Sequence, residues 1–115
     1  LHRVVQNLVG NAIRYCDHQV NISGGVNHQT NMAYVCVEDD GPGIPEEDRK
    51  RVFEAFARLD DSRTRASGGY GLGLSIVSRI AYWFGGTIEV DQSSDLGGAR
   101  FTMSWPVERF KKKKA

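Results

Sequence analysis

Two asparagines and an arginine, spaced by about one helical turn near the start of the chain, have the chemistry to bind a metal and phosphates. Asn7, Asn11 and Arg14 are spaced i, i+4 and i+7, so on a helix they form one polar stripe beside an apolar face. An amide oxygen is a hard ligand suited to Mg²⁺, and a guanidinium group grips a phosphate through two donors. An ordinary exposed helix face gives the same pattern, so the stripe alone does not decide between the two.

Two glycine-rich segments add further candidate chemistry. Residues 39–43 read Asp-Asp-Gly-Pro-Gly, which places Asp39 directly before a loop whose glycines allow a close backbone approach. A carboxylate there can accept from an exocyclic amine and so select adenine. Residues 69–74 read Gly-Tyr-Gly-Leu-Gly-Leu and lead into a predicted helix, whose free N–H groups attract phosphates. This segment fits neither a Walker A motif nor a dinucleotide fingerprint, and each segment taken singly is also consistent with a plain turn.

A helix and a strand must position these side chains, and the hydrophobic pattern predicts both. Residues 1–15 carry apolar side chains at helical spacing and predict an amphipathic helix. Residues 19–24 and 32–39 predict two strands of a hairpin, with Asn27 in its loop. Because strand side chains alternate, Asp39 shares a face with two core-facing valines and requires a buried hydrogen-bond donor.

The rest of the chain predicts further elements: a short helix over 46–51, a mobile loop over 58–69, a long helix over 72–84, and strands over 87–91 and 100–105. Gly85-Gly86 should stop the long helix. This order of elements predicts an α+β fold, a two-layer α/β sandwich with helices on one face of a mixed or antiparallel sheet.

Length and composition favour one compact domain. The chain has 115 residues, of which 40% are hydrophobic and 25% charged, as in an ordinary globular fold. We expect a domain over 1–108 and a basic, disordered tail over 109–115. The chain opens inside the first predicted helix, so we also expect an N-terminal truncation with an unpaired sheet edge or a frayed helix start.

Charge and cysteine usage exclude several classes of function. Removing the four lysines of 111–114 from the net charge of +1 leaves −3, and no basic stripe with interleaved aromatics occurs elsewhere, which argues against nucleic-acid binding. Cys16 and Cys36 lack the spacing of zinc or redox motifs, which fits a reducing cytoplasm. No apolar run reaches the roughly 20 residues that cross a bilayer, and no signal peptide opens the sequence.

Taken together and in chain order, the motifs resemble those of sensor histidine kinases. The segments 7–15, 39–43, 53–56 and 69–74 resemble that family's N box, first glycine box, F box and second glycine box. Gly85-Gly86 and residues 97–101 match its closing strands, and residues 14–16 and 96–106 look closest to its RstB group. The resemblance implies the Bergerat (GHKL) ATP-binding fold, with ATP and Mg²⁺ as cofactors.

The resemblance also implies roles for individual residues. Asn11 would be the Mg²⁺ ligand, with Asn7 lining the same site and Arg14, where the family usually has Lys, holding the phosphates. We assign Asn7 and Arg14 to catalysis on this basis. The other nucleotide-binding positions that it implies around the base are Tyr15, Asp39, Gly41, Gly43 and Ile44.

A lid over the phosphates is implied by the later motifs. Phe53, Phe56 and Arg58 would anchor it, although Ala55 stands where the family commonly has Pro, a departure that bears on the geometry of the lid. The end of the lid against the phosphates would be shaped by Gly69, Tyr70, Gly71, Leu72, Gly73 and Leu74.

Phosphoryl transfer rather than hydrolysis is expected from one substitution. The ATP-hydrolysing relatives gyrase, Hsp90 and MutL carry a glutamate four residues before the metal-binding asparagine, whereas here Asn7 has an amide that cannot act as a general base. The resemblance implies that the phosphate acceptor is a histidine on a separate dimerisation domain, since His2, His18 and His28 lie in no resembling motif.

The further partners that the resemblance implies are a response regulator receiver domain and, for the full-length protein, a second copy in a membrane-bound homodimer. The chain would then be a cytoplasmic domain at the inner membrane. Two alternatives remain: a regulatory nucleotide-binding module without transfer, or a serine-kinase anti-sigma factor of the same fold.

Overall fold

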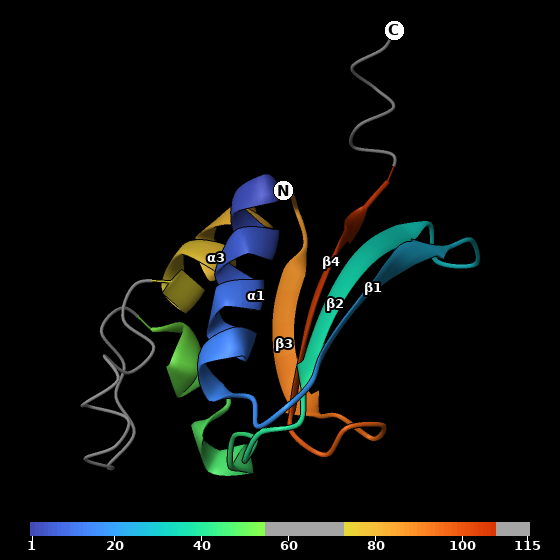
Figure 1. Cartoon of the computed structure of the whole chain (residues 1–115). Coiled ribbons are helices and arrows are strands. Elements are labelled where there is room, and N and C mark those ends of the chain that lie inside the picture. Colours follow the sequence, from blue (N-terminus) through green and yellow to red (C-terminus); the bar gives the residue numbers. More distant parts are fainter. Residues whose placement is uncertain (55–72, 108–115) are drawn as a thin grey trace, which may run out of the picture.

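The computed structural model describes residues 1–54 and 73–107. Two helices, α1 (His2–Tyr15) and α3 (Gly73–Trp83), lie on one face of a four-stranded sheet (Figure 1). The sheet has the order β1-β2-β4-β3, from β1 (Val20–Asn27), β2 (Met32–Asp39), β3 (Thr87–Gln92) and β4 (Ala99–Pro106). The predicted two-layer α/β sandwich is thereby confirmed.

All pairings between the described strands are antiparallel. Of the mixed and antiparallel sheets that the sequence left open, the described strands therefore form the antiparallel one. The reason is the connectivity: β1–β2 and β3–β4 are two hairpins, and they join through antiparallel pairing of β2 with β4, which brings Val37 beside Phe101. β2 and β4 are the two inner strands of this order, and the carboxyl end of β2 lies next to the start of β4.

Helix α1 follows the predicted amphipathic pattern. Its buried residues are Val4, Leu8 and Ala12, which recur at intervals of four and face the sheet. The helix ends after Tyr15 because Cys16 takes an extended conformation (ψ 157°), while its N–H still donates to the carbonyl of Ala12. This ending places the last turn of α1 beside the end of β2.

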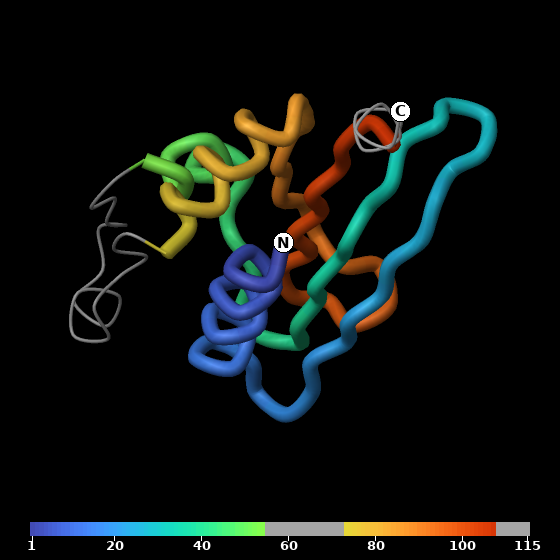
Figure 2. Tube along the Cα trace, turned by 90° about the horizontal axis from the view of Figure 1, so that it is seen from above, coloured from blue at the N-terminus to red at the C-terminus, as the bar shows by residue number. Residues whose placement is uncertain are grey.

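The core lies between the helices and the inner face of the sheet. Val35 and Val37 of β2 meet Phe101 and Met103 of β4 there, under Val77 of α3. Burying a side chain of this size contributes about 1.5–3 kcal/mol. On the edge strand β1, by contrast, Ile22 and Val26 stay largely exposed, because the β1–β2 hairpin extends beyond the helices (Figure 2).

Several predicted boundaries differ from the structure. Strand β3 reaches Gln92 rather than residue 91, and β4 covers Ala99–Pro106 rather than 100–105. The short helix expected over 46–51 consists of two 3₁₀ turns, η1 (Glu46–Asp48) and η2 (Arg51–Phe53), held by i→i+3 hydrogen bonds such as Asp48 N–H to the Pro45 carbonyl (2.9 Å). Strand β1 continues to Asn27, whose Oδ1 accepts from the N–H of Gln29 and caps the turn that follows.

The long helix, expected to reach residue 84, ends at Trp83, and Gly85 follows in a left-handed conformation (φ 76°). Within the described ranges, no helix is both long enough and apolar enough to pass through a membrane.

Candidate functional site

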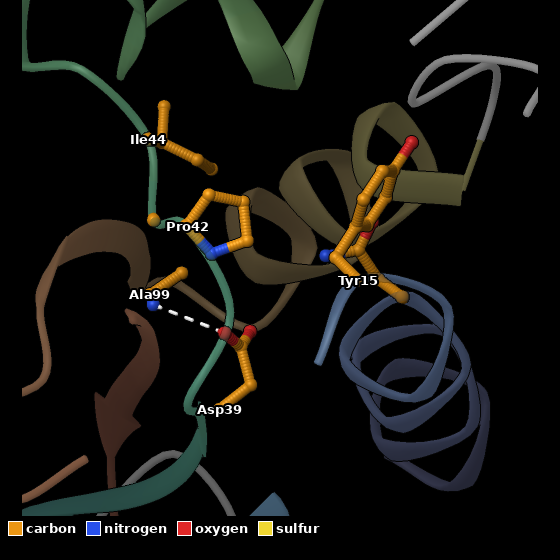
Figure 3. Close-up of a pocket in the computed structure, with 7 residues that line it drawn as sticks. Tyr15, Asp39, Pro42, Ile44 and Ala99 are labelled. Atoms are coloured by element: carbon orange, nitrogen blue, oxygen red, sulfur yellow. Dashed lines mark hydrogen bonds between the residues drawn. The ribbon is translucent and has the colours of Figure 1, made fainter. Parts of the chain in front are cut away.

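A cavity opens where the end of β2, the last turns of α1 and the start of β4 meet. It is lined by Asn11, Tyr15, Asp39, Pro42, Gly43, Ile44 and Ala99. Figure 3 shows the Tyr15 ring on one side, Pro42 and Ile44 on the other, and Asp39 between them at the base.

Asp39 is the buried carboxylate of this cavity, with only 2% of its surface exposed. Its Oδ1 accepts from the N–H groups of Gly41 (2.9 Å) and Ala99 (3.3 Å), which are the buried donors that its position required. Burial raises the pKa of Asp39 above its ordinary value, and these two hydrogen bonds oppose the rise. Among the described residues both donors bond Oδ1, so Oδ2 remains for a ligand.

The neighbouring Asp40 has a structural role. Its Oδ1 accepts from the N–H groups of Asp17 (2.9 Å), His18 (2.9 Å) and Gln19 (3.1 Å). These bonds hold the connection between α1 and β1, and they lower the pKa of Asp40 below its ordinary value, the His18 N–H most of all. The two adjacent carboxylates therefore divide their tasks: Asp39 faces the cavity and Asp40 fastens the chain around it.

The segment after β2 approaches the end of α1 very closely. A Cβ atom on Gly41 would lie 2.1 Å from the Tyr15 carbonyl oxygen, so only glycine fits between the helix and the cavity. Gly43 takes a positive φ of 78°, which turns the chain so that Ile44 lines the cavity.

Of the three polar residues predicted to form a stripe on α1, only Asn11 lines the cavity. Asn7 lies one turn earlier. The Asn7 Nδ2 is buried without a hydrogen-bond partner in the part of the chain that the structure describes. A buried amide donor without a partner costs about 1–3 kcal/mol, so an acceptor on a ligand would relieve it. Arg14 lies exposed in the last turn of α1 and outside the cavity lining.

Three residues implied by the later motifs lie away from the cavity lining. Phe53 packs edge-on against Phe101 (centroids 6.0 Å apart), and Leu74 is 1% exposed in the core. Gly73 is the first residue of α3. The structure therefore places these residues as supports of the fold, and their contact with a nucleotide stays a prediction. The other predicted positions, Phe56, Arg58, Gly69, Tyr70, Gly71 and Leu72, lie outside the described residues, as do the loop over 58–69 and the tail over 109–115.

Sequence reasoning missed two lining residues, Pro42 and Ala99. Pro42 lies inside the predicted glycine segment, so that motif could have found it. Ala99 follows Gly97 and Gly98, which were assigned only to the closing strands. Its donation to Asp39 depends on the strand register, which brings residues 60 positions apart into contact.

Known proteins resemble this chain along most of its length. Residues 1–109 match the family model described as histidine kinase-, DNA gyrase B-, and HSP90-like ATPase. The chain is 52% identical over 107 residues to the sensor protein RstB of Escherichia coli K12, covering 93% of the chain and 24% of that protein. It is 36% identical over 110 residues to the sensor histidine kinase WalK of Bacillus subtilis, covering 93% and 18%. The chain thus spans about a quarter or less of these relatives.

Solved structures show the same fold. Full-length ShkA in complex with AMPPNP superposes with a TM-score of 0.74 at 32% identity, over 90% of this chain and 20% of that one. The mycobacterial sensor histidine kinase MprB gives a TM-score of 0.70 at 28% identity, over 90% and 68%. The RstB-like segments 14–16 and 96–106 agree with the first of the sequence matches. With its cavity at the end of β2 and a match along 109 residues, the chain belongs to the family of histidine kinase-, DNA gyrase B- and HSP90-like ATPases.

Proposed function

We propose that this domain binds Mg-ATP and donates the γ-phosphate to a histidine on a separate domain, for onward transfer to the receiver domain of a response regulator. The observation that carries the proposal is the lining of the cavity: its one carboxylate among the described residues is Asp39, at the base of the cavity. One turn before Asn11, where a water-activating base would lie, the chain has the amide of Asn7. At this position, therefore, the chain has no base that could activate water to hydrolyse a bound ATP.

Base recognition would rest on Asp39 and three apolar neighbours. Oδ2 of Asp39 would accept from the exocyclic amine of adenine, since the described donors bond Oδ1. Tyr15 on one side and Pro42 and Ile44 on the other form the walls between which the flat ring of the base would lie (Figure 3). Guanine presents a carbonyl where adenine presents the amine, so it would place an acceptor against a buried acceptor.

The amides of α1 suit the phosphates and a magnesium ion. Asn11 would supply a hard oxygen ligand to Mg²⁺, and the unpartnered Nδ2 of Asn7 would donate to a phosphate oxygen. The described residues contain no group of three His, Cys, Asp or Glu side chains that could hold a metal by themselves. Bound Mg²⁺ would neutralise phosphate charge, and phosphoryl transfer then needs mainly positioning, which this rigid helix supplies.

The relatives support the proposed setting. RstB and WalK are sensor proteins several times longer than this chain, which leaves room for a histidine-bearing dimerisation domain and a sensor. We propose that the whole protein is a membrane-bound homodimer with this domain on the cytoplasmic side.

Transfer of label from radioactive ATP tests the proposal. The chain alone should bind ATP with little hydrolysis and no self-labelling. Fusing it to a histidine-bearing dimerisation domain should produce acid-labile, base-stable label, and adding that domain separately should give much less, because fusion raises the local concentration. Asn11→Ala should lower Mg-ATP affinity at least about tenfold, or by about 1.4 kcal/mol or more, and abolish labelling. Fast phosphate release by the chain alone, lost in Asn11→Ala, would instead identify a hydrolase.

A further inference from the structure

The turn between β3 and β4 wraps around the end of β2 and contacts it on both faces. Adjacent strand residues point to opposite faces, so the side chain of Glu38 faces away from the helices while Asp39 faces the cavity. The turn runs from Ser93, directly after β3, to Gly98, directly before β4. Its two ends meet these two carboxylates.

On the outer face, the hydroxyl of Ser93 joins the turn to Glu38. Ser93 Oγ donates to Glu38 Oε1 (2.7 Å) and accepts from the N–H of Leu96 (3.0 Å). Both polar side chains are buried, Ser93 with 1% and Glu38 with 9% of its surface exposed. A buried carboxylate and a buried hydroxyl would be costly here without each other, so the pair fixes the position of Ser93.

On the inner face, the other end of the turn holds Asp39. The N–H of Gly98 donates to the Asp39 carbonyl (3.0 Å), and the N–H of Ala99 donates to its Oδ1 (3.3 Å). Ser93 is bonded directly to this end as well, because its own N–H donates to the Gly98 carbonyl (2.8 Å). A continuous chain of hydrogen bonds therefore runs from Glu38 through Ser93 and Gly98 to Asp39.

We propose that Ser93, anchored by Glu38, is a positioning residue for base recognition: it fixes the turn so that Gly98 and Ala99 hold the Asp39 carboxylate with Oδ2 toward the ligand. The inference rests on the proposed function, since it assumes that Asp39 reads the exocyclic amine of adenine. Neither Ser93 nor Glu38 lines the cavity, so their effect on the base passes through Asp39.

The readout is the preference for ATP over inosine triphosphate, in which a carbonyl replaces the exocyclic amine and the adjacent N1 carries a hydrogen. Calorimetry should show that Ser93→Ala lowers this preference by about fivefold, the effect of losing about one hydrogen bond. Glu38→Gln keeps an acceptor oxygen for Ser93 and should retain the preference. Ser94→Ala is the matched control, because Ser94 is the next residue of the turn and is exposed.

A double variant separates positioning from stability. Ser93→Ala with Glu38→Leu removes both polar groups, so no buried carboxylate is left unpaired and the fold should recover stability. The double variant should nevertheless keep the reduced preference. A Ser93→Ala variant or a double variant that is folded and prefers ATP as strongly as the parent would overturn the inference. If the parent chain itself shows no preference for ATP over inosine triphosphate, the proposed function fails, and the assumption about Asp39 with it.

Discussion

Replacing Gly98 with Ala should lower both the stability of the domain and its affinity for ATP, and the contacts of Gly98 indicate how large the losses are. A Cβ atom at this position would lie 2.3 Å from Asp39 Oδ1, 2.4 Å from the Asp39 carbonyl oxygen and 2.7 Å from the Gly41 nitrogen. These neighbours would have to retreat by roughly 1 Å to reach normal contact. Such a shift stretches the hydrogen bonds from Gly98 and Ala99 to Asp39, now 3.0 and 3.3 Å long.

The expected cost follows from these contacts. Overpacking of a rigid site costs about 1–3 kcal/mol, and the two hydrogen bonds contribute about 1 kcal/mol each, so we expect Gly98→Ala to lose about 3 kcal/mol of unfolding free energy. Gly97→Ala is the matched control in the same turn: Gly97 has a positive φ of 89° but no atom within 4 Å of its Cβ position. It should lose only the backbone strain, about 1–2 kcal/mol.

Urea unfolding and calorimetric titration with ATP measure the two effects separately. Gly98→Ala should bind ATP at least about tenfold more weakly than Gly97→Ala, a difference of about 1.4 kcal/mol. Equal ATP affinities for the two variants, measured where both are folded, would refute the reasoning that close packing of this turn on Asp39 sets the geometry of the site.

Two further predictions concern Asp39 and α1. Burial raises the pKa of Asp39, so on acidification Asp39 should lose its charge at a higher pH than an ordinary aspartate, and ATP affinity should fall as it does. Asp39→Asn should lack this part of the pH profile of ATP affinity. Identical profiles for the parent and the variant, measured by calorimetry, would contradict the assignment of Asp39 to base recognition. Gly10 lies within α1 with no atom within 4 Å of its Cβ position, so Gly10→Ala should raise the unfolding free energy by about 0.5–1 kcal/mol. An unchanged or lower melting temperature would contradict the placement of Gly10 at an open position inside a helix.

Elements with a clear local period could be predicted from the sequence. The apolar spacing located α1, and the alternation in 32–39 gave β2 with its true bounds, including a buried Asp39 that needed donors. Gly41 marked the close approach to α1, and Gly43 marked the turn that follows it. In each case the signal lies within a few residues of the feature.

Contacts between distant segments could not be predicted in the same way. Asp40 fastens the backbone at 17–19, and Ala99 donates to Asp39, because the strand register brings these segments together and no local pattern encodes it. The two 3₁₀ turns after Pro45 also escaped prediction, since acidic residues in a first turn are typical of an α-helix start as well. Tertiary packing around the buried Val52 decided between them.

The hydrogen bond from Ala99 to Asp39 spans 60 residues and has a consequence for how the domain folds. Each hairpin can form locally, but the hydrogen bonds that hold the Asp39 carboxylate are complete only after β4 has docked on β2, and long-range pairing of this kind is slow. Nucleotide binding in a refolding experiment should therefore appear with the last phase rather than with the first secondary structure. Because ATP would bind only the folded domain, ATP at one hundred times its dissociation constant would add about 2.7 kcal/mol to global stability. The nucleotide would thus stabilise the pairing of the two hairpins after that pairing has formed.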